Sequence, residues 1–326
     1  MQPQAFTGSQ THTFHLTAMD VNGPLNLQET IISAQTSEPE WLRNNDIFTD
    51  VEEIDGHPVK YSLTQTGTVD QFQVKVQVVS DQLNRKAIQQ LRAHLNRVLG
   101  LEDDLPAFYR TFASQDAPLS GTFRELEGLR LMRGTDLYES LICSILSQNN
   151  SARLWNRTAR LLMKYYGKRV DFADGTSHFL FPGPEVLARV APRKLRARTS
   201  MGYRARPVVQ VSGMITEGAL RLEDFLDRSY ENAMQRLLEL PGVGPKVADC
   251  FLLYGAGKLE AAPVDVWIHR IVTKLYFRGR KVSKLKTARF LRERYGLWAG
   301  YAQLYLFDYA RRGLMDANRL RKITKR

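Results

Sequence analysis

The chain has 326 residues, of which 43% are hydrophobic, so it is long and apolar enough to hold two ordinary cores. Residues 1–116 carry 8 Lys and Arg against 15 Asp and Glu, whereas residues 117–326 carry 38 against 19, and the net charge is +12. The basic second part suits a polyanion, and no long apolar run or basic amphipathic helix favours a membrane instead.

The two cysteines, Cys143 and Cys250, exclude a disulfide framework and a four-cysteine metal cluster. Residues 1–15 are polar and contain neither a charged segment nor an apolar segment of the kind found in secretory signals. We therefore expect an intracellular protein without a metal or a cofactor.

Residues 1–116 predict an α+β domain built on an antiparallel sheet. A short strand is expected over residues 13–18, and a weakly alternating one over residues 60–66. Phe72, Val74, Val76 and Val78 alternate with polar residues, as in a half-buried strand. A helix capped by Ser80 or Asp81 should follow and end at Gly100.

Residues 117–326 predict an almost wholly helical domain with a basic C-terminal tail. Apolar residues recur at helical spacing over residues 137–145 and again over residues 154–165, with a turn at residues 148–150 between them. Residues 168–184 are expected to form a loop rich in Gly, Pro and aromatic residues, and a second turn is expected at residues 201–206.

A hairpin between two helices is the most informative stretch. It contains Gly242 and Gly244, where the backbone can approach a ligand closely, and a helix that starts there offers free N–H groups to a phosphate. Lys246 stands at the start of that helix, and Asp265 opens another helix after a Pro-Val pair. The alternative interpretation is a non-catalytic DNA-binding hairpin, in which Lys246 contacts a phosphate and Asp265 only caps its helix.

Four stretches in order resemble the 8-oxoguanine DNA glycosylase/AP lyases of the helix-hairpin-helix-GPD superfamily. They are the hairpin with its Asp, Gln148-Asn149-Asn150-Ser151-Ala152-Arg153, Gly202-Tyr203-Arg204-Ala205-Arg206, and the segment at residues 298–307. The resemblance covers most of residues 130–310 and, more loosely, the N-terminal domain. It implies an antiparallel-sheet domain followed by a helical core, and a bifunctional base excision repair enzyme that acts on duplex DNA.

The chemistry of Lys246 and Asp265 agrees with that resemblance. A lysine amine can attack the sugar C1′ of a damaged nucleotide and form a Schiff base, but only when the amine is neutral. Loss of the base builds positive charge on the sugar, and the Asp265 carboxylate can stabilise that charge. β-Elimination then breaks the strand, and neither step needs a metal.

A flipped-out base leaves a gap in the duplex that protein side chains must fill. By the resemblance, Gln148 or Asn149 enters the gap, Tyr203 wedges beside it, and Arg153 and Arg204 contact the orphaned partner base. Two arginines suit the acceptor edge of a cytosine. The structural alternatives are that Asn149 only ends a helix and that the arginines only contact phosphates.

Three further residues are expected to bind the flipped base. Gln303 and Phe307 are four residues apart, so they share one face of a helix. The resemblance implies that Gln303 reads the Watson–Crick edge, while Phe307 and Cys250 lie on opposite faces of the base. Phe307 and Cys250, taken alone, are also ordinary core residues.

The sequence departs from the resemblance at two places. Ala34, between Ser33 and Gln35, stands where the family has a Gly whose carbonyl distinguishes 8-oxoguanine from guanine. Trp267, with His269 nearby, stands where eukaryotic members have a phosphate-binding His.

We therefore expect a monomeric, DNA-associated glycosylase/lyase for 8-oxoguanine opposite cytosine, in the nucleoid of a prokaryote or the nucleus of a eukaryote. The alternatives are a glycosylase for alkylated or other damaged bases and a non-catalytic helix-hairpin-helix module.

Overall fold

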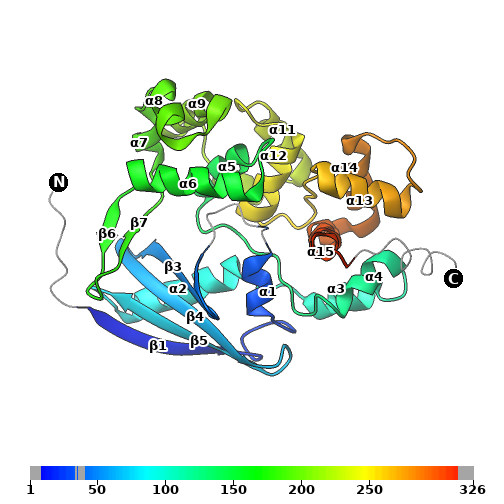
Figure 1. The fold of residues 1–326 in the computed structure, drawn as a ribbon, viewed down its shortest axis with the longest axis horizontal. Helices are drawn as coiled ribbons and strands as arrows, with labels where there is room; N and C mark the ends of the chain where they lie inside the picture. The colour runs from blue at the N-terminus through cyan, green and yellow to red at the C-terminus, as the bar shows by residue number, and fades with distance from the viewer. Residues whose placement is uncertain (1–8, 34, 36–40, 315–326) are drawn as a thin grey trace.

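The computed structural model describes residues 9–33, 35 and 41–314, and Figure 1 shows a sheet in the lower part with most helices above and beside it. The sheet is antiparallel with the strand order β1-β5-β4-β3-β2. Its strands are β1 (Gln10–Thr17), β2 (Leu42–Asn44), β3 (Ile47–Ile54), β4 (His57–Gly67) and β5 (Phe72–Ser80). The predicted class, an antiparallel sheet domain followed by a mainly helical core, is confirmed.

The strand β5 lies between β1 and β4, and its apolar face forms the centre of the first core. Val74, Val76 and Val78 are fully buried, while the polar residues between them are exposed, as their alternation predicts. Leu91 and Leu95 of helix α2 (Arg85–Val98) belong to the same core. This face of the sheet is therefore covered by α2.

The predicted cap of α2 at Ser80 or Asp81 is wrong. The strand β5 continues through Ser80, whose hydroxyl donates to the carbonyl of Pro58. Asn84 caps the helix instead, and its side chain accepts a hydrogen bond from the backbone N–H of Ala87 at 2.8 Å.

The segment expected to be a loop at residues 168–184 contains a short hairpin, β6 (Arg169–Asp171) and β7 (Ser177–Phe179). The turn of this hairpin reaches the large sheet, where buried Lys60 of β4 pairs with Asp174 and donates to the Thr176 hydroxyl at 3.1 Å. The hairpin thus joins the helical part to the sheet.

Helix α1 (Leu27–Ile32) precedes β2, and a run of helices follows α2. They are α3 (Leu105–Phe112), α4 (Ala117–Phe123), α5 (Leu137–Leu146), α6 (Ala152–Tyr166), α7 (Pro184–Ala188), α8 (Pro192–Thr199), α9 (Ala205–Thr216), α10 (Asp224–Asp227), α11 (Tyr230–Leu238), α12 (Pro245–Cys250), α13 (Val266–Tyr276), α14 (Lys284–Tyr295) and α15 (Ala299–Arg311). None of the helices in the described ranges is both long and apolar enough to span a bilayer.

The second core lies among these helices, with α5 and α15 buried along almost their whole length. It includes Leu105, Phe108 and Phe112 of α3. By packing, the helical core therefore starts before residue 116, the expected domain boundary, because the buried face of α3 contacts aromatic side chains of α15 such as Tyr305.

Arg130 connects the segments between the two cores. Its side chain is fully buried, and its guanidinium donates to the carbonyls of Pro24 at 3.0 Å, Gly100 at 2.6 Å and Asn22 at 2.6 Å. A guanidinium offers five donors in a rigid plane, which suits the carbonyls of these two chain segments, one at Asn22 and Pro24 and the other at Gly100.

Replacing Arg130 with Met should lower the free energy of unfolding by about 3 kcal/mol, because several buried carbonyls lose their donors. Urea unfolding monitored by circular dichroism measures this loss. Arg124→Met, at an exposed pair with Glu125, is the matched control and should change stability by less than about 0.5 kcal/mol. If Arg130→Met lowers the free energy of unfolding by less than about 1 kcal/mol, the carbonyls around Arg130 are bound by water or change position in the variant.

Candidate active site

The hairpin between α11 and α12 has the geometry that its glycines predict. Gly242 has φ +74°, and a Cβ atom added there would lie 2.6 Å from the Cβ of Pro207 in α9. No other residue fits without moving that helix. Gly244 is the N-cap of α12 in an extended conformation, with Pro245 in the first turn.

Lys246, in the first turn of α12, lines a cavity of about 720 Å³. The cavity lies among α5, α6, α12, α13 and α15, so its walls come from segments far apart in the sequence. Five of the residues expected at the site line it together: Lys246, Cys250, Asp265, Gln303 and Phe307.

The amine of Lys246 donates a hydrogen bond to the Ser147 hydroxyl at 2.8 Å. Ser147 caps the C-terminus of α5, and its own hydroxyl proton goes to the Ser144 carbonyl at 2.7 Å. Because that proton is committed, the Ser147 oxygen accepts from the lysine and holds the amine at the cavity wall. Sequence reasoning missed Ser147, since a serine that ends a helix indicates only a cap.

Asp265 is the N-cap of α13, as its position after Pro-Val predicts. Its Oδ1 accepts from the backbone N–H of Ile268 at 2.8 Å, which leaves the second oxygen for other partners. Burial raises the pKa of the Cys250 thiol, Lys246 lowers it and Asp265 raises it. These directions agree with the geometry, since Lys246, Cys250 and Asp265 all line the same cavity.

Gln303 and Phe307 lie one turn apart on α15 and both line the cavity. Gln303 is only 7% exposed, yet its side-chain Oε1 has no hydrogen-bond partner among the described residues. An unpaired buried amide oxygen costs about 1–3 kcal/mol, which a ligand with an N–H donor would recover. Phe307 is half-buried and so presents part of its ring to the cavity.

Ala34 lies outside the described residues, but its neighbour Gln35 lines the cavity. Gln35 is buried, and its amide donates to the Arg130 carbonyl at 2.8 Å and accepts from the backbone N–H of Met132 at 3.1 Å. Backbone groups of residues 130 and 132 therefore hold Gln35 at the cavity wall.

The two predicted DNA-gap turns contact each other. Asn149 is exposed with φ +46°, and its side-chain amide donates to the hydroxyl of Tyr203 at 3.2 Å. The ring of Tyr203 is 55% exposed, and the Arg204 guanidinium lies 4.6 Å from its centre. Gln148 donates to the Gly242 carbonyl at 3.3 Å, which joins these turns to the hairpin.

Arg204 differs from the expectation of a free reader of bases. It is buried, and its guanidinium donates to the carbonyls of Gln148, Asn149 and Met201. In this structure it holds the turn in place with Nε, Nη2 and one N–H of Nη1, which leaves the second N–H of Nη1 for another partner.

The structure places three other predicted residues at or beyond the rim. Trp267 is 62% exposed at the cavity mouth, beside Arg270. Arg153 is exposed in the first turn of α6 and does not line the cavity. His269 also lies outside the cavity, where its Nδ1 is 2.9 Å from the Thr287 hydroxyl.

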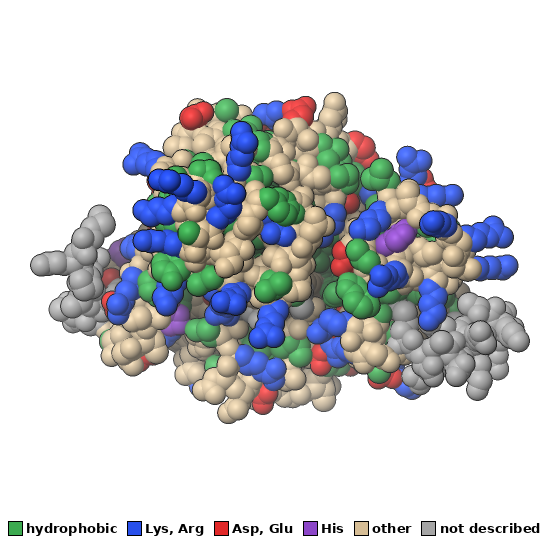
Figure 2. Space-filling model, turned by 45° about the horizontal axis from the view of Figure 1, so that its top comes forward, with side chains coloured by type: hydrophobic (Ala, Val, Ile, Leu, Met, Phe, Trp, Pro, Cys, Tyr) green, Lys and Arg blue, Asp and Glu red, His purple; other side chains and the backbone are tan. Residues whose placement is uncertain are grey.

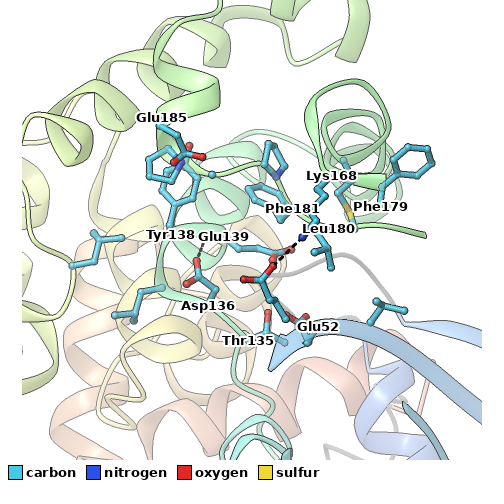
Figure 3. Close-up of a pocket in the computed structure, with 18 of the residues that line it drawn as sticks. Glu52, Thr135, Asp136, Tyr138, Glu139, Lys168, Phe179, Leu180, Phe181 and Glu185 are labelled. Carbon is cyan, nitrogen blue, oxygen red and sulfur yellow. Dashed lines mark hydrogen bonds and ion pairs between the residues drawn. The ribbon is translucent and has the colours of Figure 1, made fainter. Parts of the chain in front are cut away.

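A larger cavity of about 970 Å³ lies elsewhere, between β3 and the β6–β7 hairpin (Figure 3). Figure 3 shows Glu52 approaching from the sheet, and Asp136, Glu139 and Glu185 from the helical part. So many carboxylates repel a nucleic acid. The smaller cavity, with Lys246 inside and Arg270 and Lys274 at its mouth, is therefore the candidate active site. Among the described residues, no cluster of His, Cys, Asp or Glu could hold a metal.

Comparison with known proteins agrees with this geometry. Residues 142–296 match the HhH-GPD superfamily base excision DNA repair proteins. A probable N-glycosylase/DNA lyase from Methanothermobacter thermautotrophicus is 37% identical over 322 residues, which cover 93% of this chain and 98% of that protein.

Two solved structures share the fold. The 8-oxoguanine glycosylase/lyase from Clostridium acetobutylicum, bound to duplex DNA with cytosine opposite 8-oxoguanine, has a TM-score of 0.75 and 25% identity over 90% of this chain and 94% of its own. A 3-methyladenine DNA glycosylase from Archaeoglobus fulgidus has the same TM-score with 20% identity, covering 93% of this chain and all of its own. The second likeness concerns the fold alone.

The hairpin, its lysine and the near full-length similarity lead to one conclusion: the chain belongs to the N-glycosylase/DNA lyase family of the helix-hairpin-helix-GPD superfamily, whose members are base excision DNA repair enzymes.

Proposed function

We propose that the protein, as a monomer, excises 8-oxoguanine opposite cytosine and then cleaves the strand through a Schiff base on Lys246. One observation carries the proposal: the Lys246 amine and the unpaired amide oxygen of Gln303 line the same cavity. A nucleophile and a base-reading acceptor are the two groups that excision of a specific base requires.

In the proposed reaction the Lys246 nitrogen bonds to C1′ of the flipped nucleotide as the bond from C1′ to the base breaks, and the base leaves with the bonding electrons. The bound amine then gives up a proton, the C1′–O4′ bond of the sugar ring breaks with protonation of O4′, and C1′ becomes the carbon of a protonated Schiff base. A proton then leaves C2′, and the C3′–O bond breaks with departure of the 3′ phosphate. The hydrogen bond to Ser147 fixes the amine before the first step.

Asp265 supplies negative charge where positive charge develops on the sugar. Its Oδ1 is held by the first turn of α13, so the carboxylate is oriented without cost during the reaction. We propose that the other oxygen faces the sugar.

The Watson–Crick edge of 8-oxoguanine has N–H donors at N1 and N2 that match the free Oε1 of Gln303. Phe307 can stack on one face of the base, with the Cys250 thiol on the other. The Clostridium structure, solved with this lesion opposite cytosine, supports the same substrate pair. Arg153 and Arg204 would then face the cytosine.

An alkylated base is the second candidate. Aromatic side chains of Trp155, Tyr254, Trp267 and Phe307 line the cavity, and such rings attract a cationic base. The shared fold of the Archaeoglobus enzyme is compatible with this alternative.

Borohydride trapping tests the Schiff base. Wild-type protein should form a covalent adduct with an 8-oxoguanine:cytosine duplex, whereas undamaged duplex and Lys246→Gln should give none. Lys246→Gln should still bind a duplex with an abasic-site analogue within about threefold of wild type, because one amine is a small part of the DNA contact. Base release without an adduct would rule out the lysine mechanism, and release of 3-methyladenine alone would favour the second candidate.

Substitutions of Asp265 separate its charge from its cap. Asn is as good an N-cap as Asp, so Asp265→Asn should retain stability within about 0.5 kcal/mol, while Asp265→Ala should lose about 1 kcal/mol. Asp265→Asn should nevertheless lower single-turnover excision at least about 100-fold, because it removes charge at the transition state. If Asp265→Asn excises the base nearly as fast as wild type, Asp265 serves only as an N-cap.

Phe307→Ala should reduce single-turnover excision of 8-oxoguanine by about tenfold or more, since stacking on a base contributes about 1–3 kcal/mol. Binding to undamaged duplex, measured by fluorescence anisotropy, should be unchanged. Leu306→Ala, at a buried residue of the same helix that does not line the cavity, controls for general loss of packing. Equal unfolding of both variants would identify Phe307 as a core residue instead.

A further inference from the structure

Two segments of the helical part carry basic residues without a single acidic one. Residues 140–170 and 186–216 contain thirteen Lys and Arg and no Asp or Glu. A solvated protein surface ordinarily mixes both signs, because neighbouring like charges repel. The imbalance is therefore concentrated on α6, α8 and the turns that join them to their neighbours.

On α6 the charges form a line. Arg153, Arg157, Arg160 and Lys164 are spaced by four, three and four residues, and all four are exposed. This spacing puts them on one face of the helix, where neighbouring like charges destabilise it. No acidic residue occupies the first turn of α6 to offset Arg153 at the positive end of the helix dipole.

The helix α8 extends the same surface. It carries Arg193, Lys194, Arg196 and Arg198, all exposed, and the Arg198 guanidinium lies 5.5 Å from the ring centre of Tyr165 on α6. Among the described residues, Arg157, Lys164 and Arg198 have no carboxylate within ion-pairing distance. Figure 2 shows Lys and Arg side chains gathered on the left of this face, where α6 and α8 lie.

Both helices start or end at the Asn149–Tyr203 contact. The helix α6 begins directly after the turn that holds Asn149, and α8 ends just before Tyr203. Along α6, Arg153 and Lys164 are about 16 Å apart at a rise of about 1.5 Å per residue. That length equals about five phosphate steps of a DNA strand at about 3.4 Å each.

We propose that the exposed basic face of α6 and α8 is a second DNA-backbone contact that follows one flank of the duplex for about five base pairs beyond the lesion. The inference rests on the proposed function only in that duplex DNA is the ligand. It assigns phosphate contacts to Arg157, Lys164 and Arg198, which lie outside the cavity and both DNA-gap turns.

The test compares two triple variants. Arg157→Gln/Lys164→Gln/Arg198→Gln removes three charges from the α6–α8 face, and Arg43→Gln/Lys75→Gln/Arg85→Gln removes three exposed charges from the sheet domain. Affinity is measured by anisotropy at several salt concentrations, on undamaged duplex and on duplex with an abasic-site analogue. Use of undamaged DNA keeps the result independent of which lesion the enzyme excises.

Each lost phosphate contact should make the plot of log affinity against log salt shallower by about 0.9, so the α6–α8 variant should lose up to about 2.7 in slope and the control almost nothing. Shortening one arm of the duplex beside the lesion should weaken wild type and bring it level with the variant, while shortening the other arm should not. Thermal unfolding should show the variant to be at least as stable as wild type, since like-charge repulsion is relieved.

If the salt-dependence slope falls equally in the two triple variants, the effect comes from net charge alone, and the proposal is overturned. A loss that is the same for either shortened arm would overturn it as well, because a contact on one flank must be lost with that flank. A variant that melts at lower temperature would be replaced by Arg157→Gln/Lys164→Gln, which leaves the Arg198–Tyr165 contact in place.

Discussion

The active site depends on the packing of the end of α5 against the start of α12. Two contacts join these segments across about a hundred residues of sequence: Lys246 with Ser147, and Gln148 with the Gly242 carbonyl. The first fixes the amine of the lysine. The second fixes the turn that presents Asn149 and Tyr203, so the distance between the proposed nucleophile and the proposed gap-filling turn is set by one interface. Because Gly242 packs directly on Pro207, α9 and its Tyr203 turn are held to the same hairpin.

The sheet domain contributes through a single wall of the cavity. Gln35 reaches the site, and its amide is bound to the backbone at Arg130 and Met132. Arg130 in turn holds the chain at Asn22 and Gly100 through its guanidinium. On the other side, Arg312 just beyond α15 pairs with Glu29 of α1. Gln35 and α1 are therefore tied to the helical part by polar contacts at Arg130, Met132 and Arg312.

The sequence predicted the hairpin because Gly and Pro residues mark it. It predicted the strand β5 and several helices because their apolar residues recur with a clear period. It did not predict β3, since only Phe48 and Ile54 of that strand are buried and its other residues show no apolar alternation. It also could not assign partners to polar groups. Arg204 proved to be committed to turn carbonyls, and Ser147 proved to contact Lys246, because both contacts depend on tertiary packing.

The distribution of charge over the protein influences the direction from which DNA can approach. Residues 1–116 are net negative and the large cavity beside β3 adds several carboxylates, so this side repels a duplex. The exposed basic residues of α6 and α8 and those at the mouth of the smaller cavity attract it instead. In the binding mode that we propose, the duplex meets Asn149 and Tyr203 with the α6–α8 face on one flank and the hairpin on the other. The long-range field would then bring the DNA to these turns, and short-range contacts within the cavity would select the base.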